Sequence, residues 1–297
     1  MMAAGIDGHT QLIGLIGWPV EHSLSPLMHN AAFEDLGMNW RYLPLPVPPG
    51  QVETAVRGLA ALGFRGANVT LPHKRAVISV LDSIDPHAAA LGAVNTLVVG
   101  RRAGKGAVVG GYNTDDQGFV GALRRGGFSP GNGDKAIVVG AGGAARAIVH
   151  GLLQSGSGEV LVLNRSLERA RSLVSDLGQT PGEAARLHAL PLSAETLVAS
   201  VQAAELLVNA TPTGMWPDVE DSIWPAGTPI PAHLTVFDLV YNPLETRLLQ
   251  QARESGARAL DGLEMLVRQG ALSFELWTGQ PAPIDVMRAA CVRALGG

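Results

Sequence analysis

Short apolar runs rich in β-branched residues alternate with segments of helical apolar spacing along most of the chain. The apolar runs predict strands over residues 12–16, 40–47, 67–70, 96–99, 136–139, 159–163, 205–208 and 235–239. Between them, apolar positions spaced i, i+3 and i+4 predict helices over residues 26–36, 51–62, 116–125, 143–153 and 166–177. This alternation favours an α/β fold with parallel sheets, in which the helices are the crossovers.

Four prolines mark the second predicted strand and the residues after it. Pro44 and Pro46 lie on alternate positions of the strand, and Pro48 and Pro49 follow. Because proline cannot donate a hydrogen bond to an interior ladder, this run is predicted to be an edge strand that ends in a loop.

The length of the chain, 297 residues, exceeds that of a usual single domain and favours two domains. A net charge of -4 provides no basic surface for nucleic acid or anionic lipid, so a small molecule is the expected partner. No apolar run approaches the roughly 18 residues that a membrane span needs.

The single cysteine, Cys291, has no partner within the chain, which excludes an intrachain disulfide and a cysteine-based metal site. No other metal-binding pattern stands out, and no metal is expected. A chain without disulfides is typical of a reducing compartment. Residues 1–15 also lack the basic segment and cleavage signal of a secretory peptide, so a cytoplasmic location is expected.

A glycine-rich turn follows the predicted strand at residues 136–139. Its sequence fits the G-x-G-x-x-A pattern of dinucleotide-binding domains and lies between a strand and a helix. The first glycine allows the turn, the second lets the backbone approach a pyrophosphate, and free amides at the helix N-terminus face the phosphates. The residues expected to bind the cofactor here are Gly140, Ala141, Gly142, Gly143 and Ala144.

The residues after the next predicted strand favour NADP over NAD. Domains that prefer NAD usually place an acidic residue about 20 positions after the glycine turn, where it accepts from the ribose 2′-hydroxyl. This chain has Asn164, Arg165 and Ser166 instead, with Arg169 one turn later. An amide, a hydroxyl and two guanidinium groups suit a 2′-phosphate, although arginines on a solvated helix face would give the same sequence.

Four short polar motifs precede the glycine turn, each after a predicted strand or before a predicted helix. They are S-L-S-P at residues 23–26, N-V-T-L-P-H-K at 68–74, G-A-V-N-T at 92–96 and G-Y-N-T-D-D at 111–116. Ligands of open α/β sheets bind beyond the carboxyl ends of the strands, so the polar groups of these motifs are expected to converge there.

In sequence and order, these motifs resemble those of shikimate dehydrogenases. N-A-T-P-T-G-M at residues 209–215, D-L-V-Y-N-P at 238–243 and D-G-L-E-M-L-V-R-Q at 261–269 continue the resemblance over nearly the whole chain. The resemblance implies an α/β substrate-binding and catalytic domain over residues 1–112 and a Rossmann-type NADP-binding domain over 113–262. It also implies C-terminal helices over 263–297 that pack back on the first domain.

The resemblance further implies roles for individual residues. The substrate hydroxyls and carboxylate would be bound by Ser23, Ser25, Thr70, Asn95, Asp115, Tyr241 and Gln269. Lys74 and Asp115 would form the catalytic pair, and Leu239 and Gly262 would border the nicotinamide.

Lys74 and Asp115 also suit this chemistry on physical grounds. Hydride addition to a ketone places negative charge on its oxygen, which a lysine ammonium stabilises and can protonate. Asp115 can hold the lysine side chain and accept from a substrate hydroxyl. Without the motifs, Lys74 would be interpreted as an exposed cation, and Asp115 and Ser25 as helix N-caps.

The implied reaction is the reversible, NADP-dependent reduction of 3-dehydroshikimate to shikimate in chorismate biosynthesis. A quinate/shikimate dehydrogenase is one alternative, although such enzymes often use NAD and carry an acidic residue where this chain has residues 164–166. A catalytically silent protein that senses a metabolite is another, because fold alone does not determine function. The presence of both Lys74 and Asp115 argues against it. A monomer or a homodimer is expected.

Overall fold

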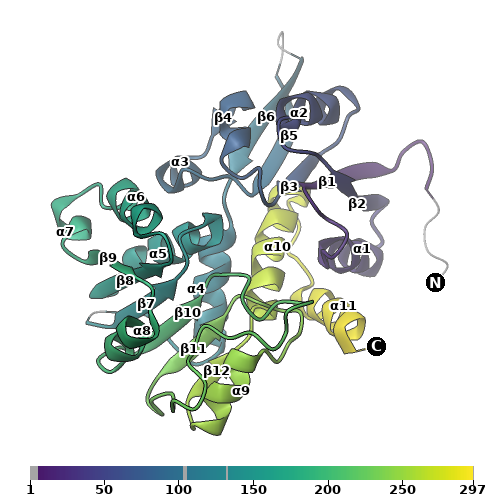
Figure 1. Ribbon diagram of the computed structural model, residues 1–297. Helices are drawn as coiled ribbons and strands as arrows, with labels where there is room; N and C mark the ends of the chain where they lie inside the picture. Colours follow the sequence, from purple (N-terminus) through teal and green to yellow (C-terminus); the bar gives the residue numbers. More distant parts are fainter. Residues whose placement is uncertain (1–5, 103–105, 132, 297) are drawn as a thin grey trace. The chain divides into compact units, whose positions relative to one another are not determined.

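A computed structural model describes residues 6–102, 106–131 and 133–296 (Figure 1). It divides the chain into a first unit, Met1–Thr114 with Leu266–Gly297, and a second unit, Asp115–Met265. The first unit therefore takes residues from both ends of the chain, whereas the second is one continuous segment.

The first unit is built on a six-stranded sheet of order β2-β1-β3-β5-β6-β4. Its strands are β1 (Gln11–Gly17), β2 (Trp40–Pro46), β3 (Gly66–Val69), β4 (Ser83–Ile84), β5 (Thr96–Arg102) and β6 (Gly106–Tyr112). β1 runs parallel to β2 and β3, but β5 is antiparallel to both β3 and β6. The prediction of parallel sheets is therefore wrong for this unit, whose sheet is mixed.

The strand β6 accounts for part of this error, because it forms an antiparallel hairpin with β5. It is not predicted from the sequence, because Gly106, Gly110 and Gly111 weaken its strand pattern. At Gly111, a β-carbon would lie 2.4 Å from Cδ1 of Leu81, so the packing of the segment before β4 favours glycine at this position. Close packing thus favours glycine where a larger apolar side chain would have marked the strand in the sequence.

β2 lies at the edge of the sheet, and this confirms the prediction made from its prolines. Pro44 and Pro46 pair with Leu15 and Gly17 of β1 in the parallel register. The strand ends at Pro46, so the two following prolines lie in the loop.

Helices from both ends of the chain pack together in the first unit. They are α1 (Ser25–Asp35), α2 (Val52–Ala61), the 3-10 helix η1 (Ala76–Val80), α3 (Pro86–Leu91), α10 (Leu263–Thr278) and α11 (Ile284–Gly296). α11 packs against α1, and a β-carbon at Gly270 of α10 would lie 2.3 Å from Cε of Met28 in α1. Trp277 of α10 donates from Nε1 to the carbonyl of Leu97 in β5 (2.9 Å). The C-terminal helices therefore pack back on the first unit, as predicted.

The second unit is a six-stranded, fully parallel sheet of order β12-β11-β10-β7-β8-β9. Its strands are β7 (Lys135–Val139), β8 (Glu159–Asn164), β9 (Leu187–Pro191), β10 (Leu206–Asn209), β11 (Thr235–Asp238) and β12 (Arg258–Leu260). Its helices are α4 (Asp115–Arg125), α5 (Gly143–Gln154), α6 (Leu167–Leu177), α7 (Pro181–Ala184), α8 (Ala194–Val201) and α9 (Arg247–Glu254). This is the predicted Rossmann-type arrangement.

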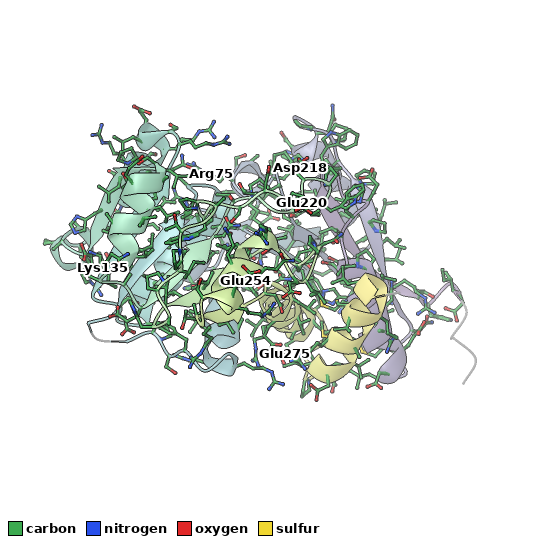
Figure 2. All side chains as sticks on the ribbon, turned by 60° about the horizontal axis from the view of Figure 1, so that its bottom comes forward. Arg75, Lys135, Asp218, Glu220, Glu254 and Glu275 are labelled. Carbon is green, nitrogen blue, oxygen red and sulfur yellow. The ribbon has the colours of Figure 1, made fainter. Side chains whose placement is uncertain are left out.

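Both faces of this second sheet are buried. In β7, Ala136 and Val138 belong to an apolar cluster with α4, α5 and α6, whereas Ile137 and Val139 belong to a cluster with α8 and α9. A strand that is buried on both faces is a continuous apolar run, and this is why the sequence predicts it clearly. Charged side chains such as Glu254 on α9 are exposed (Figure 2).

Candidate active site

The substrate motifs of the first unit include the loops beyond the carboxyl ends of β1 and β3. Thr70, the first residue after β3, donates its amide to the carbonyl of Ile16 (2.8 Å), and the Trp18 amide donates to the Leu71 carbonyl (2.9 Å). These bonds join the two loops. A β-carbon at Gly17 would lie 2.3 Å from Cγ2 of Thr70, so glycine allows this close approach.

Ser23 and Ser25 lie at the start of α1. Ser23 Oγ accepts from the amide of Ser25 (3.2 Å). The N-cap of α1 is Leu24, which makes no side-chain hydrogen bond, so the interpretation of Ser25 as a capping residue is wrong. The Ser25 side chain is buried and forms a hydrogen bond with the Tyr42 hydroxyl.

Lys74 lies in the turn between β3 and η1 and is partly exposed. Its carbonyl accepts from the amide of Val94 (2.8 Å), which ties this turn to the G-A-V-N-T motif. The preceding residue, His73, is buried, and its Nε2 lies 2.6 Å from the Val47 carbonyl oxygen. Arg75, which follows, is exposed (Figure 2). The backbone of the turn is therefore anchored where it carries the lysine.

A buried cluster of amide and hydroxyl groups joins two of the predicted substrate residues. Asn95 donates from Nδ2 to Oγ1 of Thr114 (2.9 Å) and to Oε1 of Gln269 (3.4 Å). Asn95 Oδ1 accepts from the Thr114 amide (3.0 Å), and Thr114 Oγ1 donates to the carbonyl of Gln269 (3.0 Å). The structure thus brings Asn95 and Gln269 together, although they are 174 positions apart.

The cluster extends to residues for which the sequence predicts no individual role. Asn68 donates from Nδ2 to Oγ of Ser273 (3.0 Å) and accepts from the Tyr42 hydroxyl (2.8 Å). Ser273 Oγ lies 2.7 Å from Thr96 Oγ1, which donates to Oδ1 of Asn95 (2.8 Å). Through Tyr42 the cluster continues to the start of α1. We call this set the polar network; its members are Ser25, Tyr42, Asn68, Asn95, Thr96, Thr114, Gln269 and Ser273.

Asp115 directly follows Thr114 of the polar network. It is the first residue of α4 and belongs to the second unit. Its side chain is buried, and so is that of the next residue, Asp116. Asn113 donates to the carbonyl of Ala93 (2.9 Å), so the two residues before Asp115 are both held by side-chain hydrogen bonds.

The predicted glycine turn joins β7 to α5. Gly140 has a φ of 119°, and a β-carbon there would lie 2.9 Å from the carbonyl oxygen of Ala210. Gly142 is the N-cap of α5, has an ordinary φ of -91°, and a β-carbon there would meet nothing within 4 Å. Gly140 is therefore required by the turn itself, whereas Gly142 leaves open space above the first amides of α5.

The residues predicted to meet a 2′-phosphate lie at the end of β8 and the start of α6. Asn164 donates from Nδ2 to the carbonyl of Ser166 (2.9 Å), and Ser166 is the N-cap of α6. Arg165 and Arg169 are exposed. The structure also places a carboxylate here that the prediction did not include. Ser166 Oγ donates to Oε2 of Glu168 (3.2 Å).

A second buried group of polar side chains lies at the carboxyl ends of β10 and β11. Asp238 accepts from Nδ2 of Asn209 (2.9 Å), from the amide of Val240 (3.1 Å) and from Oγ1 of Thr246 (2.7 Å). Burial raises the pKa of Asp238 to about 6, against the effect of these hydrogen bonds. Asn209 Oδ1 also accepts from Oγ1 of Thr211 (2.6 Å), so the group shapes both loops that leave these strands.

Leu239 and Gly262, predicted to border the nicotinamide, lie against each other. A β-carbon at Gly262 would lie 2.1 Å from the carbonyl oxygen of Leu239, and the Gly262 amide donates to the carbonyl of Val240 (3.2 Å). Tyr241, a predicted substrate residue, follows in the same loop and is partly exposed.

Three segments of the sequence match known families. Residues 15–97 match the shikimate dehydrogenase substrate binding domain, residues 124–217 match shikimate / quinate 5-dehydrogenase, and residues 262–291 match the shikimate 5'-dehydrogenase C-terminal domain. Together these matches lie in both units of the structure.

Full-length relatives agree with these matches. A protein of Methanopyrus kandleri named shikimate dehydrogenase (NADP(+)) is 46% identical over 294 residues, 99% of this chain and 99% of that protein. A crystal structure of a shikimate dehydrogenase in complex with NADP+ has a TM-score of 0.88 at 37% identity and covers 99% of each chain. The shikimate 5-dehydrogenase of Thermus thermophilus, solved in complex with NADP(H) and shikimate, has a TM-score of 0.83 at 39% identity. That match covers 96% of this chain and 100% of the Thermus chain.

Proposed function

Because the chain belongs to the shikimate dehydrogenase family, we propose that it reduces 3-dehydroshikimate reversibly to shikimate with NADPH, a step of chorismate biosynthesis. It is an NADP-dependent oxidoreductase. The observation that carries the proposed reaction is the polar network, which ends one residue before Asp115. A buried array of hydroxyl and amide groups suits a ring that carries several hydroxyls, because each substrate hydroxyl then finds an oriented partner.

The residues of the second unit fit NADP. The open N-terminus of α5 offers unpaired amides to the pyrophosphate, while Ala141, Gly143 and Ala144 keep the turn and the first helical residues small. Asn164, Arg165, Ser166 and Arg169 would hold the 2′-phosphate. The loop of Leu239 and Gly262 would border the nicotinamide with its backbone. When bound, NADPH supplies the hydride that the ketone carbon accepts.

The first unit would bind the substrate together with Asp115 and Tyr241. Ser23, Ser25, Thr70, Asn95 and Gln269 are the proposed ligands of its hydroxyls and carboxylate. Ser25, Asn95 and Gln269 are already fixed by the polar network. Their orientation therefore precedes substrate binding, which lowers the entropy lost when the complex forms.

Lys74 and Asp115 are the proposed catalytic pair. As hydride reaches the carbonyl carbon, the Lys74 ammonium stabilises the growing negative charge on oxygen and donates its proton there. The products of this step are the alcohol, NADP+ and a neutral lysine, which takes up a proton from solvent. Asp115 would accept a hydrogen bond from a substrate hydroxyl.

Four assays test the proposed reaction: oxidation of shikimate and of quinate, each with NADP and with NAD, followed by nicotinamide absorbance. Shikimate with NADP should give the highest kcat/KM. A higher value with quinate or with NAD would instead indicate a quinate dehydrogenase, and activity in none of the four would indicate a binding protein.

We also propose that the enzyme acts in the cytoplasm as a monomer or a homodimer, on small molecules and without nucleic acid or membrane partners. Cys291, the single cysteine, is buried and free, which suits a reducing compartment. Among the described residues, no helix has the length and apolarity to cross a bilayer. Sedimentation of the purified protein would decide between the two oligomeric states.

A further inference from the structure

We propose that the buried hydrogen-bonded pair of Asp116 and His150 is a positioning pair, which holds the first turn of α4, and Asp115 with it, against the helix that follows the glycine turn. The inference rests on the proposed function of Asp115. Neither Asp116 nor His150 belongs to the proposed catalytic or binding residues.

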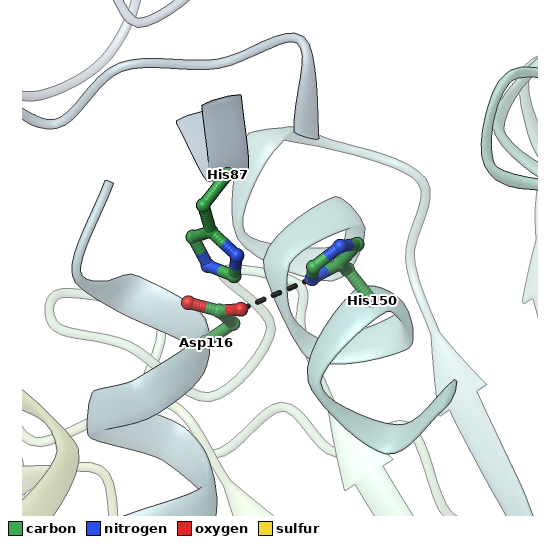
Figure 3. Close-up of side chains that lie close together, drawn as sticks. All are labelled: His87, Asp116 and His150. Carbon is green, nitrogen blue, oxygen red and sulfur yellow. Dashed lines mark hydrogen bonds and ion pairs between the residues drawn. The ribbon is translucent and has the colours of Figure 1, made fainter. Parts of the chain in front are cut away.

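The pair joins α4 to α5 within the second unit. Oδ2 of Asp116 lies 3.0 Å from Nδ1 of His150 (Figure 3). Asp116 is 3% exposed and His150 7%, so the interaction is shielded from solvent. The other carboxylate oxygen, Oδ1, accepts from the amide of Gln117 (2.8 Å). Amides in the first turn of a helix have no carbonyl partner within the helix, so the side chain supplies one. One side chain thus fixes both its own helix end and the neighbouring helix.

The two helices touch at the residue after His150. A β-carbon at Gly151 would lie 3.3 Å from both Cβ and the carbonyl oxygen of Asp116, and 3.2 Å from Cγ2 of Val120. The first turn of α4 therefore rests on the backbone of α5 without an intervening side chain. Apolar side chains of both helices pack in one cluster around this contact, and the Asp116–His150 hydrogen bond adds a directional contact that favours a single register of the two helices.

Stability alone does not account for a buried polar pair at this position. Burying a carboxylate and an imidazole requires desolvation of both, and apolar residues of similar volume often stabilise such a site equally well or better. A pair of fixed geometry can instead orient the groups next to it. Asp115 is adjacent to Asp116, and His150 lies about two turns after the start of α5. The pair therefore links the residue proposed to act on the substrate to the helix proposed to bind the pyrophosphate.

The test compares Asp116→Ala, Asp116→Asn and Val120→Ala. Asp116→Ala removes the pair; Asp116→Asn keeps its shape and one acceptor; Val120→Ala weakens the same helix contact without touching the pair. We expect Asp116→Ala to lower kcat for shikimate oxidation about tenfold with an almost unchanged KM for NADP, since small misplacements of catalytic groups have effects of this order. Asp116→Asn should restore most of kcat, and Val120→Ala should leave kcat within about twofold of wild type.

Amide hydrogen exchange of residues 115–119 provides a readout that does not depend on turnover. Exchange should be faster in Asp116→Ala than in Val120→Ala at equal global stability. Equal kcat and equal exchange in these two variants would overturn the positioning role. Inactive wild-type protein would refute the proposed function, and unchanged exchange in Asp116→Ala would then refute the positioning pair separately.

Discussion

The two units build their parts of the proposed site in opposite ways. In the first unit, the binding groups are buried side chains that are paired with one another, as Asn95 is with Gln269. In the second unit, the glycine turn works through missing side chains: Gly140 has no room for a β-carbon, and Gly142 leaves the N-terminus of α5 open. The first arrangement is therefore sensitive to the removal of atoms, and the second to their addition.

The largest effect of removing atoms should occur where the first unit supplies the reacting group. Lys74→Ala should lower kcat roughly 1000-fold, because it deletes the proposed proton donor. The circular dichroism spectrum and the melting temperature should stay close to those of wild type. Arg75→Ala, which removes an exposed cation from the adjacent position, is the matched control and should keep wild-type kcat. Wild-type turnover in Lys74→Ala would refute the assignment.

An added methyl group should have different effects at the two glycines of the turn. Gly142→Ala should raise KM for NADP about tenfold at an unchanged melting temperature, since the added carbon meets no protein atom but occupies the proposed pyrophosphate space. Gly140→Ala should instead lower the free energy of unfolding by about 1–3 kcal/mol, because its φ of 119° is strained for alanine. Steady-state kinetics and urea titrations of both variants measure the contrast. Equal melting temperatures of the two variants would contradict it.

Removing one hydroxyl should weaken the polar network. Ser273→Ala leaves Asn68 and Thr96 each without one buried partner, so the free energy of unfolding should fall by about 1–3 kcal/mol. KM for shikimate should rise as Asn95 loses its support. Ser79→Ala removes an exposed hydroxyl that bonds only locally and should have little effect on either quantity. Equal unfolding curves for the two variants would show that the network contributes little.

The units should also respond to acid in opposite directions. Burial lowers the pKa of His29 in the first unit from 6.5 to about 3, so the folded state excludes a proton that the unfolded chain binds below pH 6.5. This group therefore destabilises the first unit increasingly as the pH falls from 6.5 toward 3. Burial raises the pKa of Asp238 from 3.8 to about 6, so the second unit gains stability as the pH falls through that range.

Hydrogen exchange of each unit at pH 6.5 and pH 4.5 measures this difference. After correction for the intrinsic exchange rate, protection should fall in the first unit and rise in the second. His29→Phe should remove the acid sensitivity of the first unit, and the exposed His233→Gln should not. Parallel changes in both units would contradict the assignment of these two groups.

The sequence predicts those elements whose hydrophobic pattern is complete within a few consecutive residues. Strands buried on both faces, such as β7 and β10, are continuous apolar runs. The short edge strands β9 and β12 have mixed polarity and are not predicted, and β6 is hidden by its glycines. An edge strand has fewer buried positions, and its pattern is therefore weaker.

The same reasoning applies to the site. Motifs identify Asn95 and Gln269, but the roles of Tyr42 and Ser273 follow only from contacts across the fold. Ser273 and Asn68 are 205 positions apart, and no spacing in the sequence relates them. The one local signal is that Ser273 lies four residues, about one helical turn, after Gln269.

The return of the C-terminal helices to the first unit affects how the protein is made. Residues 1–114 are synthesised before the second unit, yet the first unit also needs Gln269, Ser273 and Trp277, which are synthesised after it. The second unit is continuous and has all its residues earlier. The first unit is therefore completed only after the second has been synthesised, and until then the backbone at Gly66 of β3 and Leu97 of β5, which Trp277 contacts, is open to chaperones and to other nascent chains.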